Sequence, residues 1–127
     1  MAEGLLAFVG VGRRDARTAA DELARRIVML RIFEDAQGRM NRSLLEVGGT
    51  LAVVSQFTLF GDAREGRRPF FGEAAPAAQA APLVDAVAET ARALGAPVVC
   101  GRFGARMDVE LVNAGPVTVL LDTERLF

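Results

Sequence analysis

The chain has 127 residues, of which 51% are apolar, and its formal net charge is −1. This length suits one domain, and the charge does not favour binding along a nucleic-acid backbone. Neither histidine nor lysine occurs, which excludes a Ser-His-Asp triad, histidine-ligated zinc and a lysine Schiff base. Without a membrane-length apolar run or a basic N-terminal cluster, we expect neither a membrane span nor a secretory signal.

The N-terminal part of the chain carries a strand signal and then a helix signal. Residues 4–11 form an apolar run between glycines, which predicts a central strand covered on both faces. Residues 16–30 place apolar side chains at helical spacing, which predicts a helix with Asp15 as its N-cap. Oppositely charged residues four positions apart predict ion pairs on its outer face, joining Asp21 to Arg25 and Glu22 to Arg26.

The next stretch is short and mixed. Residues 31–34 predict a brief strand, and the Asp35-Ala36-Gln37-Gly38 sequence predicts a turn after it. Residues 40–47 are ambiguous, with a single helical turn as one interpretation. The pair Gly48-Gly49 then leads into the next apolar segment.

An apolar strand with a polar end follows. Residues 51–54 predict a buried strand, and a hydroxyl, an amide, an aromatic ring and a second hydroxyl come directly after it, from Ser55, Gln56, Phe57 and Thr58. A buried polar group without a partner costs about 1–3 kcal/mol, so such groups either find partners or mark a site. Taken alone, the stretch is also explained as a strand end that turns to solvent.

A polar loop over residues 61–71 contains arginines beside aromatic rings. Arg64, Arg67 and Arg68 precede Phe70 and Phe71, a combination that could hold phosphates and stack a base. As a lone feature the cluster is weak evidence, because most surface arginines are simply solvated.

The C-terminal half predicts a helix and three strands. The alanine-rich residues 76–94 predict a helix packed on a sheet, with Pro82 in its first turns. Residues 98–103 predict a strand with Cys100 in the core, and this single cysteine suits a reducing, cytoplasmic setting. Two further strands are predicted on either side of the turn sequence Asn113-Ala114-Gly115-Pro116, at residues 107–112 and 117–121.

Two motifs together resemble a known family. Ser55-Gln56-Phe57-Thr58 and Asn113-Ala114-Gly115-Pro116-Val117-Thr118 are similar to the two signature motifs of the D-aminoacyl-tRNA deacylases. The similarity extends to segments before and between the two motifs, namely 30–35, 40–41, 43–45, 48–49, 66–69, 101–104 and residue 107.

The resemblance implies an α/β fold of one domain over residues 1–127, with a mixed β-sheet packed against two main helices and the family's first strand missing. It implies a homodimeric enzyme without metal or cofactor. Such an enzyme hydrolyses the ester of D-aminoacyl-tRNA at the 3′-terminal adenosine, and of glycyl-tRNA mischarged on tRNA-Ala, as chiral proofreading in the cytoplasm.

The resemblance also assigns site residues. The catalytic group would be Ser55, Gln56, Phe57 and Thr58, with backbone N–H groups near Phe57 and Thr58 as an oxyanion hole. Substrate binding and rejection of L-amino acids would fall to Asn113, Gly115, Pro116 and Met107, through a cis Gly-Pro bond inserted into the partner's site. Arg64, Arg67 and Arg68 are candidate tRNA contacts.

The sequence leaves several alternatives open. Water aided by the ribose 2′-hydroxyl is the favoured nucleophile, and Thr58 is the alternative, although no side chain is an obvious base for it. The chain could instead be an inactive tRNA-binding remnant of the family or a related deacylase with altered amino-acid specificity. A small-molecule binding protein has no specific feature in its favour.

Overall fold

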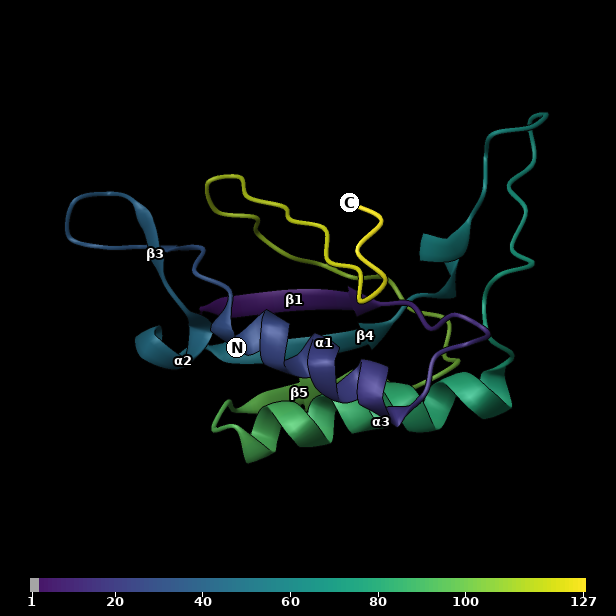
Figure 1. The fold of residues 1–127 in the computed structure, drawn as a ribbon. Coiled ribbons are helices and arrows are strands. Elements are labelled where there is room, and N and C mark those ends of the chain that lie inside the picture. The colour runs from purple at the N-terminus through teal and green to yellow at the C-terminus, as the bar shows by residue number, and fades with distance from the viewer. Residues whose placement is uncertain (1–2) are drawn as a thin grey trace.

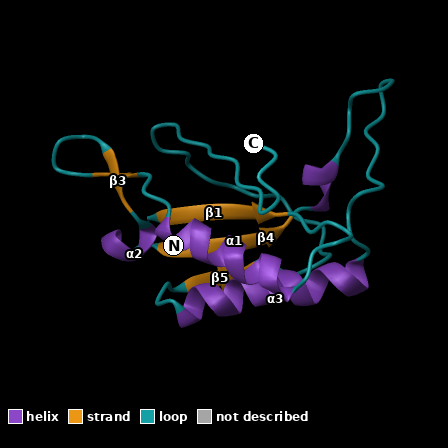
Figure 2. Ribbon diagram, viewed as in Figure 1, coloured by secondary structure: helices purple, strands orange, loops and turns teal. Residues whose placement is uncertain are grey.

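A computed structural model describes residues 3–127, which contain both strands and helices (Figures 1 and 2). In chain order they are β1 (Gly4–Val9), α1 (Arg17–Met29), β2 (Phe33–Glu34), β3 (Met40–Arg42), α2 (Leu44–Val47), β4 (Thr50–Ser55), the 3₁₀ turn η1 (Phe57–Phe60), α3 (Ala77–Ala93) and β5 (Val98–Cys100). None of the helices in this range combines the length and apolarity needed to cross a bilayer. The predicted α/β class with two main helices is confirmed.

The principal sheet has the strand order β1-β4-β5, and both of its pairings are parallel. β2 and β3 form a separate antiparallel pair. The predicted central position of the first strand is wrong, because within residues 3–127 β1 pairs only with β4 and lies at the sheet edge. Its apolar run is consequently only half-buried, and Phe8 is 40% exposed.

The core lies between the sheet and the two long helices. Side chains alternate along β4, so that Leu51 and Val53 are fully buried while Ala52 and Val54 point to the other face. Small residues such as Ala24 and Ala91 on α1 and α3 are also fully buried, which allows the helices to approach each other closely. Figure 1 shows α1 and α3 on the same side of the sheet.

The predicted polar contacts of the first helix are wrong. The N-cap residue is Ala16, and no side chain caps it; the Asp15 carboxylate instead accepts a hydrogen bond from the Gly12 N–H at 2.7 Å. Asp21 accepts hydrogen bonds from Arg17 at 2.9 Å and from the Thr90 hydroxyl at 2.7 Å, so it links α1 to α3. Glu22 pairs with Arg125 at 3.4 Å. Asp21 therefore pairs at i,i+4 spacing with the arginine before it, Arg17, and the partner of Glu22 comes from the C-terminal segment.

The ambiguous residues 40–47 contain both β3 and α2. Ser43 accepts a hydrogen bond from the Glu46 N–H at 3.2 Å, and the Glu46 carboxylate accepts one from the Ser43 N–H at 3.1 Å. This reciprocal capping box fixes the start of α2.

The predicted strands at 107–112 and 117–121 are wrong, because this stretch forms no strand. The segment folds back on itself beside β1, on the side away from the helices (Figure 1, yellow). Its apolar side chains are largely exposed, and Val112 is 93% exposed. Cys100 is likewise exposed, so its predicted core position is wrong. An alternating pattern forms a strand only where its backbone is hydrogen-bonded to a neighbouring strand, and within residues 3–127 this segment makes no such bond to β1 or to another strand.

Candidate active site

The first motif lies where β4 ends. Ser55 is the last residue of β4 and pairs with Val9, and the Gln56 N–H donates to the Val9 carbonyl at 2.8 Å. The chain then turns into η1, whose last residue, Phe60, packs over the exit of β1. A Cβ atom on Gly10 would lie 3.0 Å from the Phe60 ring, so the absence of a side chain at Gly10 makes room for that ring. The carboxyl ends of neighbouring parallel strands are a common location for ligand sites in α/β proteins.

The first turn of η1 leaves two adjacent backbone donors unused. The Leu59 N–H donates to the Gln56 carbonyl at 3.2 Å, and the Gly61 N–H donates to the Thr58 carbonyl at 2.9 Å. No acceptor within residues 3–127 is found for the N–H groups of Phe57 and Thr58. The start of a helical turn leaves such donors free, and a pair of them can bind a developing oxyanion.

The side chains of the motif are partly exposed and uncharged. The Gln56 amide donates a hydrogen bond to the Thr58 hydroxyl oxygen, and Ser55 is half-buried beside them. Phe57 is 57% exposed and contacts Phe71 edge-on, with ring centroids 5.3 Å apart. Within the described residues no carboxylate is hydrogen-bonded to Thr58, so its hydroxyl has no evident base.

The second motif is a loop stabilised by Asn113. The Asn113 side-chain oxygen accepts from the Val117 N–H at 3.1 Å, and its amide nitrogen donates to the Thr118 hydroxyl at 3.2 Å. Between them the Gly115-Pro116 peptide bond is cis, and Gly115 has a φ of 126°. That φ is unfavourable for an L side chain, and a Cβ atom there would lie 2.9 Å from Val117, so the position suits glycine.

Within one chain the two motifs do not meet. A groove of about 1980 Å³ beside β1 is lined by Gly115 of the second motif and by Phe60, two residues after the first motif, but by no residue of the first motif itself. Figure 1 shows the turn of the yellow segment toward the start of β1, whereas η1 follows the end of β4. Met107 lies nearer the first motif. A Cβ atom added to Gly101 would be 3.5 Å from the Met107 side chain and 3.6 Å from Val54, which is in the strand that leads into that motif.

The arginine-containing loop is attached directly to η1. Arg64 pairs with Asp62 at 2.6 Å, and this contact holds the pKa of the Asp62 carboxyl at about 2. Arg67 and Arg68 are exposed and form no ion pair within residues 3–127. Sequence reasoning grouped the three arginines and missed this difference, although Asp62 stands two residues before Arg64, the spacing of an Asx turn.

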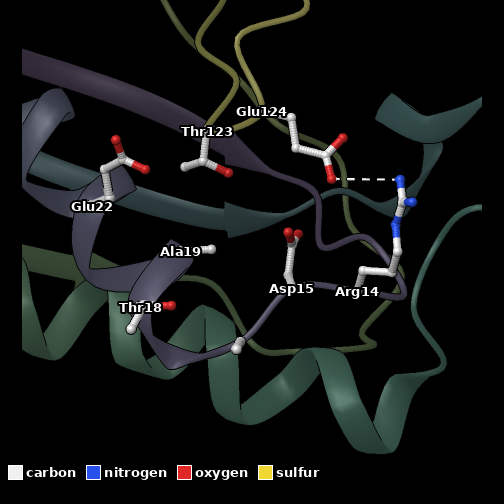
Figure 3. A pocket seen from close by; sticks show the side chains of 8 residues that line it. Arg14, Asp15, Thr18, Ala19, Glu22, Thr123 and Glu124 are labelled. Atoms are coloured by element: carbon white, nitrogen blue, oxygen red, sulfur yellow. Dashed lines mark ion pairs between the residues drawn. The ribbon is translucent and has the colours of Figure 1, made fainter.

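A second, shallower depression lies where α1 begins (Figure 3). Its charged groups are already engaged with the protein: Arg14 pairs with Glu124 at 3.6 Å, and Asp15 accepts from Gly12. Within residues 3–127 no three His, Cys, Asp or Glu side chains gather as metal ligands would. The strand end at Ser55 to Thr58 therefore remains the better candidate for a reaction site.

Comparison with known proteins identifies similar sequences over nearly the whole chain. The sequence model of the D-Tyr-tRNA(Tyr) deacylase family matches residues 1–122. A D-aminoacyl-tRNA deacylase of Thermomicrobium roseum is 60% identical over 98% of this chain and 80% of its own length. The protein of that name from Symbiobacterium thermophilum is 53% identical over 98% of this chain and 82% of its own length.

Solved structures show the same fold. A structure described as a c-Myc DNA unwinding element binding protein is 32% identical, with a TM-score of 0.88 over 94% of this chain and 82% of its own. A probable eukaryotic D-amino acid tRNA deacylase has a TM-score of 0.68 at 20% identity, over 81% of this chain and 76% of its own. At 20% identity, the similarity to the eukaryotic protein shows a shared fold and nothing more.

Proposed function

Because this chain belongs to the D-Tyr-tRNA(Tyr) deacylase family, we propose that it hydrolyses the ester of D-aminoacyl-tRNA at the end of β4. It is a hydrolase of the D-aminoacyl-tRNA deacylase type. The substrate is aminoacyl-tRNA, bound by its 3′-terminal adenosine, and translation places the reaction in the cytoplasm. Glycyl-tRNA mischarged on tRNA-Ala is a second substrate in this proposal.

The observation that carries the proposal is the pair of free N–H groups on Phe57 and Thr58. Attack on an ester produces a tetrahedral oxyanion, which adjacent, preorganised backbone donors stabilise. Removing one such donor from a hydrolase typically costs about 10²–10³-fold in rate. An aminoacyl ester is already activated, so positioning and oxyanion stabilisation are sufficient chemistry for this site.

Water is the nucleophile in this proposal, assisted by the 2′-hydroxyl of the terminal ribose. Among the described residues no carboxylate is hydrogen-bonded to Thr58, and its oxygen already accepts the Gln56 amide, so Thr58 binds and orients the substrate. Ser55 and Gln56 line the pocket around the ester. Covalent catalysis by Thr58 would need a base that residues 3–127 do not place next to it.

The second motif would act on the site of a second copy. The turn of residues 107–121 and η1 lie toward different ends of β1, which favours completion of the site by Gly115 and Pro116 of a partner subunit (Figure 1). A rigid backbone wall formed by Gly115 and Pro116, with Asn113 bracing the loop and Met107 on the pocket side, would exclude an L side chain. A hydrogen atom in the same place would be tolerated, so both D-amino acids and glycine would fit.

The test is hydrolysis of D-tyrosyl-tRNA compared with L-tyrosyl-tRNA by the native chain. We expect rapid clearance of the D-ester only. Preferential cleavage of the L-ester would instead indicate a deacylase with altered specificity, and tRNA binding without turnover would indicate an inactive remnant. Thr58→Val, which keeps the backbone donors but removes the hydroxyl, should retain part of the activity if water is the nucleophile and lose it if Thr58 is.

A further inference from the structure

The loop over residues 61–72 is a constrained projection and not a loose connection. Two backbone hydrogen bonds of 2.8 Å join Asp62 and Phe70, closing the base of the loop as an antiparallel bridge. Figure 1 shows the loop after η1 extending well beyond the sheet and the helices. Below the bridge, Phe71 contacts Phe57, so the base of the loop is attached to the candidate active site.

One of the three arginines stabilises the loop itself. Arg64 donates two hydrogen bonds to the Asp62 carboxylate, at 2.9 and 2.6 Å, and the same carboxylate accepts from the Arg64 backbone N–H at 3.0 Å. The Arg64 charge is thus neutralised at short range. The Asp62 carboxylate takes up two of the five guanidinium N–H donors and offsets the positive charge, which weakens the attraction of Arg64 for a phosphate.

The other two arginines are available for a ligand. Arg67 and Arg68 follow Gly66, whose φ of 67° turns the chain at the tip, and both side chains are exposed without an ion pair in the described part of the chain. Glu65 shares the tip, so two cations face one anion there. Adjacent exposed guanidinium groups on a loop that is closed at its base by the Asp62–Phe70 bridge suit the backbone of a nucleic acid.

We propose that Arg67 and Arg68 bind phosphates of the tRNA acceptor arm several nucleotides from the terminal adenosine, while Arg64 braces the loop that presents them. This inference rests on the proposed function and assigns the substrate's second contact. Four residues from the bridge to the tip span at most about 13 Å. At about 3.4 Å per stacked nucleotide, that reach covers about four nucleotides beyond the ester.

The experiment compares two substrates that differ in length. D-Tyrosyl-adenosine carries only the ester and its nucleoside, whereas a D-tyrosyl minihelix also carries the acceptor stem. For Arg67→Ala/Arg68→Ala we expect a KM on the order of tenfold higher for the minihelix, with its kcat and the hydrolysis of D-tyrosyl-adenosine unchanged. The slope of log KM against log salt should fall by about 1.4–1.8, the value for two lost phosphate contacts.

The matched control removes two exposed arginines elsewhere. Arg25 and Arg39 form no ion pair within residues 3–127, and the double variant Arg25→Ala/Arg39→Ala should leave both substrates unaffected. Arg64→Ala should change the slope of log KM against log salt far less than the double variant Arg67→Ala/Arg68→Ala, the tip variant, does. An equal effect of the control, an unchanged minihelix KM in the tip variant, or an equal loss on D-tyrosyl-adenosine would each overturn the inference.

A readout without turnover separates this inference from the proposed function. Binding of uncharged minihelix RNA to the native chain and the tip variant needs no hydrolysis. If the native chain hydrolyses neither substrate, the proposed function fails, and binding of the RNA alone decides the role of the loop. Equal affinity of the two proteins for the RNA would overturn the inference.

Discussion

The contact between Asp62 and Arg64 lowers the pKa of the Asp62 carboxyl and also holds the backbone at Arg64. The carboxylate accepts from the Arg64 side chain and backbone, and its pKa is lowered from 3.8 to about 2. Because the pKa of Asp62 is lower in the native state than in the unfolded state, the contact contributes fully to the free energy of unfolding at any pH above the unfolded-state pKa. Its contribution is lost as the pH falls from that value through about 2.

Arg64→Ala should therefore raise the pKa of Asp62 toward 3.8, as measured by NMR titration of its carboxyl carbon. Asp35 provides an internal control, because backbone N–H groups of Arg39 and Gln37 lower its pKa independently of Arg64. A value for Asp62 that stays near 2 in the variant would show that the ion pair is not the cause.

Pro116 tests the proposed chiral wall. We expect Pro116→Ala to weaken rejection of L-aminoacyl esters more than it slows hydrolysis of D-esters, because the loop loses its rigidity while the N–H donors near Thr58 remain. The measurement is the ratio of kcat/KM for D- and L-tyrosyl-tRNA. Pro97→Ala, at an exposed position before β5, is the control, and a parallel loss on both enantiomers would contradict the role of Pro116.

At the scale of elements, α2 depends on its capping box. Ser43→Ala removes the acceptor for the Glu46 N–H at a buried position and should lower the free energy of unfolding by about 1 kcal/mol. Because the chain has no tryptophan, urea unfolding is best followed by far-UV circular dichroism.

Glu46→Gln is the matched control for that prediction. It keeps an oxygen acceptor for the Ser43 N–H, so the reciprocal bonds survive and stability should stay within about 0.5 kcal/mol of native. A loss equal to that of Ser43→Ala would show that the carboxylate charge, and not the hydrogen-bond pattern, stabilises α2.

Elements with strong helical periodicity were predicted well, and elements that need a distant partner were not. α1 and α3 follow from apolar residues such as Ile27 and Val87 at regular spacing, a signal contained within each segment. A strand instead requires hydrogen bonds from another segment, so the alternation over 107–112 could not establish one. Likewise Asp21 contacts Thr90, a residue that no local spacing could indicate.

The sequence predicted a candidate site at the polar end of a buried strand, with backbone N–H groups near Phe57 and Thr58 as its oxyanion hole. The polar residues after a buried strand pointed to Ser55 through Thr58, and that stretch does form the strand end. The unpaired N–H groups of Phe57 and Thr58 depend on the 3₁₀ turn, which side-chain patterns do not encode. The pairing of Arg64 with Asp62 had a local signal in the two-residue spacing of an Asx turn, whereas Arg67 forms no ion pair within residues 3–127.

At the scale of the whole molecule, the apolar groove predicts association. Segment 107–127 exposes large apolar side chains, among them Leu111, Leu120 and Leu126. A stable interface buries about 1,200–2,000 Å² in total, and these residues supply an apolar centre for one. We expect sedimentation equilibrium to give twice the chain mass of 13.5 kDa.

Leu120→Asp should shift this equilibrium toward monomer and reduce turnover of D-tyrosyl-tRNA, because a charge in the contact would be desolvated. Leu94→Asp changes an exposed apolar residue at the end of α3, on the helical side, and should do neither. A monomeric Leu120→Asp variant that still cleaves D-esters and rejects L-esters would contradict completion of the site by a second copy.

The edge position of β1 has a consequence for amide hydrogen exchange. Along a strand, the backbone N–H and C=O of one residue point to the same side, and those of the next residue point to the opposite side. The Val9 carbonyl faces β4, because it accepts the Gln56 N–H. The amides of Leu6 and Phe8 therefore point to the open side, where residues 3–127 provide no acceptor, while those of Leu5 and Ala7 face β4. Deuterium uptake should alternate along a single strand, fast at Leu6 and Phe8 and slow at their neighbours. Any chain that pairs with this edge would make the uptake uniform.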